Sequence, residues 1–148
     1  MNNMIKREKY LKRIRPFYEQ DLIKVITGIR RCGKSVILNQ IMDELRQSGV
    51  KDEQIIYINF EFTDYIDIND AKKFNDFIEK KLINKNKYYV FFDEIQNVDR
   101  WEKVVNSLKA KYNENISIFI TGSNSDLLSG ELATHIAGRY VSFKIYPF

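Results

Sequence analysis

The strongest constraint on the fold is a glycine-bearing segment, residues 28–35, that matches the pattern Gly-x-x-x-x-Gly-Lys-Ser without a mismatch. A short apolar run at 22–27 precedes it, and an amphipathic helical pattern begins at Lys34. The pattern needs this context, because its glycines let the backbone curl until successive N–H groups converge on a phosphate at a helix N-terminus. The segment therefore predicts a phosphate-binding loop between a strand and a helix.

Two side chains of this loop are expected to carry its chemistry. Lys34 reaches the outer phosphates as a point charge, and the Ser35 hydroxyl takes one position on Mg²⁺. Cys32 is interpreted as a tolerated small side chain, since such loops bind through their backbone. The residues predicted to contact the nucleotide are Gly28, Arg30, Arg31, Cys32, Gly33, Lys34, Ser35 and Val36.

A second segment ends in two adjacent carboxylates. Residues 88–92 are the most hydrophobic of the expected strands, and Asp93 and Glu94 follow them directly. Charges at the end of a buried strand are costly without a partner such as a metal ion. We therefore expect Asp93 to support Mg²⁺ and Glu94 to orient or deprotonate an attacking water. Together the two segments predict a domain that binds ATP and hydrolyses it.

The rest of the chain alternates apolar strands with amphipathic helices, which indicates a parallel sheet covered on both faces. Strands are expected at residues 22–27, 55–60, 88–92, 116–121 and 140–146, and helices from 34, at 70–82, after 99 and at 126–137. The predicted fold is α/β, a P-loop NTPase three-layer sandwich with about five mainly parallel strands and the nucleotide at their carboxyl edge. Asp99 and Glu102 have the spacing of a capping box, and Trp101 is interpreted as a core anchor against the sheet.

Composition limits the alternatives. The 148 residues are 44% hydrophobic, which suits one domain, and no stretch approaches the ~20 apolar residues that span a bilayer. A single cysteine supplies neither an intrachain disulfide nor a zinc cluster, and we expect a cytoplasmic protein without a membrane contact. Residues 1–31 carry nine basic and three acidic side chains. A solvated helix face is the favoured interpretation of this charge, and contact with phosphates, nucleic acid or an acidic partner is the alternative.

These features resemble the AAA+-type ATPase domains of a widespread prokaryotic family. The resemblance covers essentially the whole chain and rests on four segments, residues 27–35, 92–96, 121–125 and 137–140. It implies that Ser123 senses the γ-phosphate or the attacking water, with Thr121 and Asn124 as the nearest competitors. It also implies that Asn59 can hold the catalytic glutamate away from water until a partner binds.

The resemblance further implies that Arg139 is an arginine finger or a phosphate-sensing arginine. It then acts on its own nucleotide or, in a homo-oligomer, on the nucleotide of a neighbouring subunit. The sequence departs from complete proteins of this type, because it stops directly after the last expected strand with no helical lid. We therefore expect residues 1–148 to be an AAA+-type ATPase core that is truncated before a C-terminal domain.

The motifs leave the purpose of hydrolysis open. Turnover that drives the remodelling of a partner is the first hypothesis, and a nucleotide-gated switch that binds protein or DNA with slow hydrolysis is the second. A P-loop kinase is a weaker hypothesis, because the sequence shows no arginine-rich acceptor lid. GTP is disfavoured, because residues 84–87 lack the acidic residue of the guanine-reading Asn-Lys-x-Asp pattern.

Overall fold

A five-stranded parallel sheet forms the centre of the molecule. The computed structural model describes residues 7–29, 33–83, 86–123 and 140–146. Within these ranges the strand order is β2-β3-β4-β1-β5, and every neighbouring pair runs parallel. The strands are β1 Ile23–Thr27, β2 Ile55–Asn59, β3 Tyr88–Asp93, β4 Ile116–Gly122 and β5 Tyr140–Lys144. The expected strands are confirmed, with ends that differ by one or two residues.

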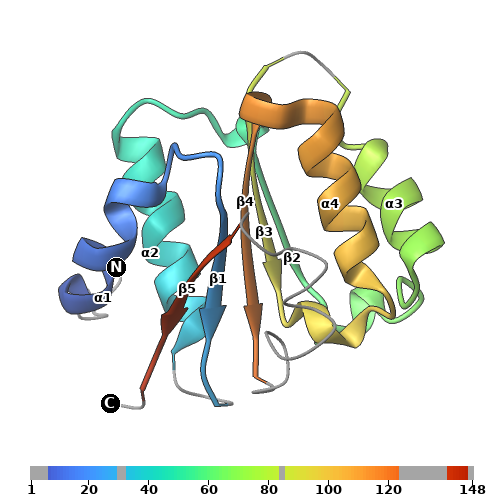
Figure 1. Ribbon diagram of the computed structural model, residues 1–148, viewed down its shortest axis with the longest axis horizontal. Coiled ribbons are helices and arrows are strands. Elements are labelled where there is room, and N and C mark those ends of the chain that lie inside the picture. Colours follow the sequence, from blue (N-terminus) through green and yellow to red (C-terminus); the bar gives the residue numbers. More distant parts are fainter. Residues whose placement is uncertain (1–6, 30–32, 84–85, 124–139, 147–148) are drawn as a thin grey trace.

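Helices cover both faces of this sheet and give three layers (Figure 1). On one face lie α1 Glu8–Ile14 and α2 Lys34–Gln47, and on the other lie α3 Ala71–Glu79 and α4 Trp101–Tyr112. Parallel strands need such crossovers, because a tight turn cannot return the chain to the same end of the sheet. Short 3₁₀ turns complete the described elements: η1 Arg15–Phe17, η2 Asp52–Gln54, η3 Thr63–Tyr65, η4 Ile95–Asn97 and η5 Asn113–Asn115.

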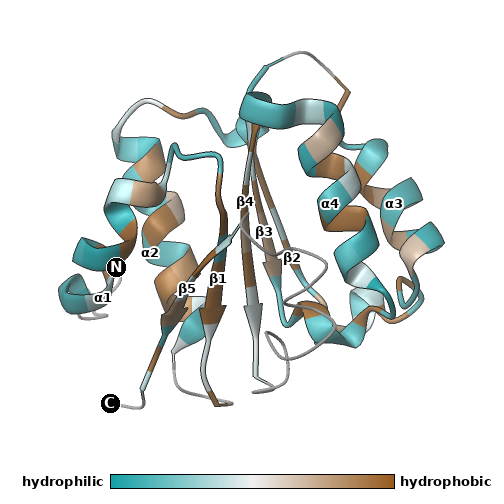
Figure 2. Cartoon of the chain, viewed as in Figure 1, coloured by the Kyte–Doolittle hydropathy of each residue, from teal (hydrophilic) through white to brown (hydrophobic). Residues whose placement is uncertain are grey.

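Two hydrophobic clusters, one on each face, hold the layers together. On the α2 face, Phe91 stacks on Phe119 at 4.5 Å between ring centroids. On the α4 face, Phe74 meets Phe92 edge to face at 4.9 Å, and Trp101 is 6% exposed, which confirms its role as a core anchor. The strands β3 and β4 are buried along their whole length because helices cover both of their faces, and Figure 2 shows hydrophobic colour concentrated on the sheet and on the helix stripes beside it.

The start of α4 differs from the sequence prediction. The helix begins at Trp101 after Arg100, whose φ of 55° is left-handed, and no side chain caps it. The backbone N–H of Asp99 donates to the carbonyl of Asn69, within an isolated bridge between Asp70 and Asp99. The predicted capping box of Asp99 and Glu102 is therefore wrong, because this bridge between distant segments fixes the backbone before the helix starts.

Helix α3 is shorter than predicted. Asp70 is its N-cap and accepts a hydrogen bond of 2.9 Å from the backbone N–H of Lys73, which satisfies one of the free donors at the helix start. The helix ends at Glu79, whereas the apolar spacing predicts an end at Leu82. Leu82 is still buried, so the apolar pattern continues into the turn after the helix. Among the described residues, no helix has the length and apolar character that crossing a membrane requires.

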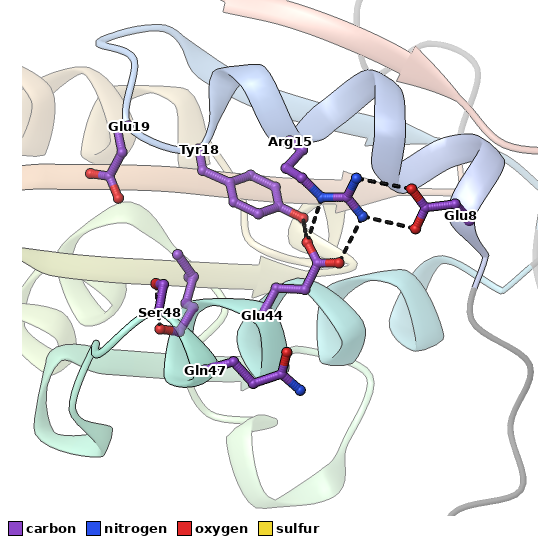
Figure 3. A pocket seen from close by; sticks show the side chains of 8 residues that line it. Glu8, Arg15, Tyr18, Glu19, Glu44, Gln47 and Ser48 are labelled. Atoms are coloured by element: carbon purple, nitrogen blue, oxygen red, sulfur yellow. Dashed lines mark hydrogen bonds and ion pairs between the residues drawn. The ribbon is translucent and has the colours of Figure 1, made fainter.

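The basic N-terminal segment forms an amphipathic helix, as the favoured interpretation predicts. In α1 the charged face, which includes Lys9, Lys12 and Arg13, is exposed, while Leu11 and Ile14 are fully buried. Arg15, just after the helix, is half-buried. Its guanidinium lies beside an open cleft of about 650 Å³ between η1 and the last turns of α2 (Figure 3).

A hydrogen-bond network in this cleft attaches the N-terminal segment to α2. Glu44 accepts two hydrogen bonds from Arg15, at 3.0 and 2.8 Å, and one of 2.8 Å from the Tyr18 hydroxyl (Figure 3). Arg15 also donates two hydrogen bonds of 2.9 Å to Glu8. Hydrogen bonds to Glu44 and Glu8 raise the pKa of Arg15, and burial with the bond to Glu44 raises that of Tyr18.

Glu44→Ala is expected to lower the free energy of unfolding by about 1–3 kcal/mol, because it removes two hydrogen bonds from Arg15 and one from Tyr18, while Arg15 keeps its bonds to Glu8. Urea unfolding followed by circular dichroism measures this change. The matched control is Asp43→Ala, the adjacent change on the same helix, whose ion pair with Arg46 is exposed and should be worth less than about 1 kcal/mol. Equal effects of the two substitutions would show that the Glu44 network does not hold the N-terminal segment.

Candidate functional site

The phosphate-loop segment joins β1 to α2 at the carboxyl edge of the sheet, the lower edge in Figure 1. Gly33 immediately precedes α2 and has a φ of 99°. Glycine adopts this left-handed backbone conformation readily, whereas a residue with a Cβ atom is strained in it. The glycine therefore lets the chain turn into α2 with Lys34 as the first helical residue.

The Lys34 side chain is buried and turned toward its own loop. Its Nζ donates to the backbone carbonyls of Gly28, at 2.7 Å, and Ile29, at 3.1 Å. The same nitrogen lies 3.4 Å from Oε2 of Glu94, in an ion pair whose side chains are 3% and 7% exposed. The predicted phosphate-binding lysine and the predicted catalytic glutamate are thus in direct contact.

Asp93 is fully buried at the end of β3 and accepts hydrogen bonds from three hydroxyl groups. Ser35 Oγ and the Tyr57 hydroxyl donate to Oδ2, at 2.5 and 2.6 Å, and Thr121 Oγ1 donates to Oδ1 at 2.5 Å. These donors come from α2, β2 and β4, so they meet at Asp93 only because β2 and β4 are the two neighbours of β3 in the sheet. Buried carboxylates need such partners, and burial together with the bond to Asp93 raises the pKa of Tyr57.

Glu94 follows β3 in a left-handed conformation, with a φ of 54°. Its Oε1 accepts hydrogen bonds from Ser123 Oγ and, at 2.8 Å, from Gln96 Nε2. Its backbone N–H donates to Thr121 Oγ1 at 2.9 Å. Burial alone would raise the pKa of Glu94, but the hydrogen bonds from Ser123 and Gln96 and the charge of Lys34 outweigh burial and lower it. At neutral pH the group is therefore a carboxylate, which is the form a general base needs.

The structure brings together the predicted residues Lys34, Ser35, Asp93, Glu94 and Ser123. Gly28 takes part through its carbonyl, and Val36 lies half-buried in the first turn of α2. The predictions for Arg30, Arg31, Cys32, Asn124 and Arg139 concern positions outside the described residues.

Asn59 lies beside Asp93 in the register of β2 and β3. Its Oδ1 accepts a hydrogen bond of 2.9 Å from the backbone N–H of Glu61. The side-chain hydrogen bonds to Glu94 described above come from Ser123 and Gln96 instead. A role for Asn59 in controlling the glutamate stays a prediction.

Sequence reasoning gave no role to Tyr57 or Gln96, and named Thr121 only as a competitor of Ser123. Tyr57 pairs with Phe91, two residues before Asp93 on the neighbouring strand, so its hydroxyl reaches Asp93 diagonally across the sheet face. The sequence signal for Tyr57 was the two-residue alternation of β2, which places Tyr57 and Asn59 on one face. This alternation points to Asp93 only once β2 is known to pair with β3.

The donor set suits a magnesium ion. Ser35 Oγ and Asp93 Oδ2 are oxygen atoms 2.5 Å apart, and Mg²⁺ prefers oxygen ligands. Within the described ranges, His, Cys, Asp and Glu side chains form no cluster of three able to hold a metal. Mg²⁺ does not require one, because it usually keeps several waters and takes substrate phosphates with one or two carboxylates.

The parallel sheet, the left-handed glycine before α2 and the hydroxyl and carboxylate cluster at the carboxyl edge define an α/β P-loop NTPase. Residues 20–148 match the AAA domain family. This match covers most of the chain, and the chain belongs to that family.

Two relatives are described only as uncharacterised proteins. The chain is 50% identical over 145 residues to one from Haemophilus influenzae, covering 97% of this chain and 36% of the relative. It is 44% identical over 125 residues to one from Methanocaldococcus jannaschii, covering 84% of this chain and 26% of the relative. The chain thus spans only about a third or less of the length of these relatives.

Solved structures with the same fold are distant in sequence. A DNA polymerase III gamma subunit-related protein from Thermotoga maritima has a TM-score of 0.65 at 11% identity, covering 92% of this chain and 45% of that one. RuvB from the same organism has a TM-score of 0.63 at 15% identity, covering 95% and 45%. Drosophila ORC, solved with AT-rich DNA and Cdc6, has a TM-score of 0.53 at 13% identity, covering 93% and 53%. These similarities establish the fold.

Proposed function

We propose that this chain binds ATP together with Mg²⁺ and hydrolyses it. The observation that carries the proposal is the contact of Lys34, at the start of α2, with Glu94, the second of two acids after β3. Beside this pair, Ser35 donates to Asp93, so one edge of the sheet holds a lysine, a hydroxyl group and two carboxylates, which are the groups that phosphate hydrolysis needs.

Each residue has a role that its surroundings favour. Ser35 and Asp93 would hold Mg²⁺, which when bound supplies positive charge to the outer phosphates. Thr121 and Tyr57 hold the Asp93 carboxylate in place through their hydroxyl groups. Ser123 contacts Glu94 and lies 3.5 Å from Lys34 Nζ, which suits a residue that reports on the γ-phosphate.

Hydrolysis then proceeds in line. The oxygen of a water molecule bonds to the γ-phosphorus while the bond from that phosphorus to the β,γ-bridging oxygen breaks. Glu94 takes one proton of the water, the other stays on the new phosphate, and ADP leaves with the electron pair of the broken bond. The lowered pKa of Glu94 keeps the base ionised before this step.

Lys34 connects nucleotide binding to the activation of this base. Its ammonium group now contacts the carbonyls of Gly28 and Ile29 and Oε2 of Glu94. Phosphate oxygens carry more charge than carbonyls and accept stronger hydrogen bonds. A bound γ-phosphate therefore draws Lys34 away from Glu94, and Oε2 becomes free to accept the proton of water.

We further propose that residues 1–148 are the ATPase core of a longer cytoplasmic protein in which turnover drives the remodelling of a partner. The greater length of the two relatives supports the longer protein. Arg139 would act as a finger, in its own subunit or across a homo-oligomer. The alternative is a nucleotide-gated switch with slow hydrolysis. DNA is the partner to test first, because Drosophila ORC, which shares the fold, was solved bound to DNA.

Phosphate release from ATP, measured with and without double-stranded DNA, distinguishes an ATPase that drives remodelling from a nucleotide-gated switch. A motor core is expected to release phosphate steadily without DNA and to prefer ATP to GTP. A rate near zero that rises strongly only with DNA would support the switch. Wild-type chain that neither binds nor hydrolyses ATP under either condition would contradict both.

A further inference from the structure

Gln96 lies in η4, the single turn that follows Glu94. Its amide nitrogen donates a hydrogen bond of 2.8 Å to Oε1 of Glu94. An ionised carboxylate only accepts hydrogen bonds, so the nitrogen end of the amide must face Glu94. Ser123 donates to the same oxygen, which leaves Oε2 as the oxygen that faces Lys34.

The oxygen end of the same amide makes, within the described part of the chain, no hydrogen bond that would stabilise the fold. Gln96 Oε1 is buried and, among the described residues, has no hydrogen-bond partner. A buried acceptor without a donor reduces stability, and native structures contain few of them. An apolar side chain of similar length would avoid this cost. The presence of an amide at this position is therefore better explained by its contact with Glu94 than by packing.

The local backbone fixes this contact. Glu94 adopts a left-handed φ of 54°, which is uncommon for a glutamate and costs energy. The turn that follows is closed by a hydrogen bond of 3.3 Å from the Asn97 N–H to the Glu94 carbonyl, and Thr121 holds the Glu94 N–H. Both ends of the Gln96–Glu94 contact are thus attached to one short, constrained segment.

We propose that Gln96 is a positioning residue for Glu94: by holding Oε1 together with Ser123, it presents Oε2 to the attacking water. This inference rests on the proposed ATPase function. Ser123 alone would leave Oε1 of Glu94 with one hydrogen bond and the carboxylate freer to rotate about its last bond. Gln96 supplies the second donor from another segment of the chain: it lies two residues beyond Glu94, whereas Ser123 directly follows β4.

Two substitutions separate the donor role from a role of shape. Gln96→Met keeps the length of the side chain and removes both the donor and the acceptor of the amide. Gln96→Glu keeps the shape almost unchanged but replaces the donor by a carboxylate against Glu94. A positioning donor predicts that turnover falls in the order Gln, Met, Glu, whereas a role of shape predicts that Glu is the better replacement.

The experiment measures the single-turnover rate at saturating ATP, the Kd for ATP and the unfolding midpoint of each variant. Gln96→Met is expected to lower the rate about tenfold, because Glu94, the proposed base, loses one hydrogen bond to its charged carboxylate. The Kd should stay within about twofold of wild type, and the unfolding midpoint should be unchanged or higher. Gln96→Glu is expected to lower the rate further. The control, Asn97→Met, removes the neighbouring amide, which donates to the Phe60 carbonyl, and should leave the rate unchanged.

The outcomes distinguish this inference from the function on which it rests. Wild-type chain without ATP binding or turnover overturns the ATPase proposal itself. Normal wild-type turnover with an equal rate in Gln96→Met overturns only the positioning role. A fall in the rate that comes with weaker ATP binding or a lower unfolding midpoint assigns Gln96 to the structure of the site and also overturns the positioning role.

Discussion

Glu94→Gln is expected to lower ATP turnover by about two orders of magnitude or more while ATP still binds. The amide has nearly the same shape as the carboxylate but cannot take a proton from water, and general-base assistance is typically worth ~10²–10⁴-fold. Lys34, Ser35 and Asp93 are unchanged in this variant, so the groups expected to bind phosphate and Mg²⁺ remain. Phosphate release and a fluorescent-nucleotide titration on the same sample measure both quantities.

Glu53→Gln is the matched control for this prediction. It makes the same carboxylate-to-amide change on the exposed turn η2, away from the site, and should leave turnover at the wild-type rate. If Glu94→Gln also retains hydrolysis, the base lies elsewhere. If it loses nucleotide binding as well, Glu94 supports the binding site instead of the chemical step.

Lys34→Ala is expected to weaken ATP binding by about 100-fold or more. The substitution removes a buried cation that can donate to the outer phosphates, and each hydrogen bond between charged groups is worth about 1.5–3 kcal/mol. It also removes the ion pair to Glu94, although Ser123 and Gln96 still hold the other carboxylate oxygen. Titration with a fluorescent ATP analogue measures the affinity.

Lys72→Ala serves as the control, because it removes an exposed lysine from α3 that pairs with Asp76 at the surface. Its ATP affinity should equal that of wild type. The unfolding midpoint of Lys34→Ala has to be measured alongside, so that a loss of binding can be separated from a loss of folding. A folded Lys34→Ala protein with unchanged affinity would show that the loop at 28–35 is not the nucleotide site.

Most of the fold could be predicted because its signals are periodic and local. Apolar runs marked all five strands, and the pattern of residues 28–35 fixed where β1 ends and α2 begins. The helix starts were less predictable. At α4 the local spacing of Asp99 and Glu102 indicated a cap, but the distant pairing of Asp99 with the segment at Asn69 determined the backbone.

For the candidate site, the sequence predicts some neighbours and misses others. That Ser35, Asp93 and Glu94 lie close together could be expected, because each belongs to a short motif at the carboxyl end of a strand or the start of a helix, while their roles stay predictions. Tyr57 could not, because its contact with Asp93 depends on which strand neighbours β3 and in what register. Gln96 lay within a motif used for the resemblance, yet its contact with Glu94 became evident only from the left-handed Glu94 and the turn that follows it.

The most direct test of ATP hydrolysis is a single-turnover measurement with wild-type chain in excess over radiolabelled ATP, in Mg²⁺ and after chelation by EDTA. We expect bound ATP to be converted to ADP and phosphate in Mg²⁺ and to remain largely intact after chelation, since Ser35 and Asp93 form an oxygen donor set that suits Mg²⁺. Recovery of the bound ATP unchanged in the presence of Mg²⁺ would contradict the proposed hydrolysis.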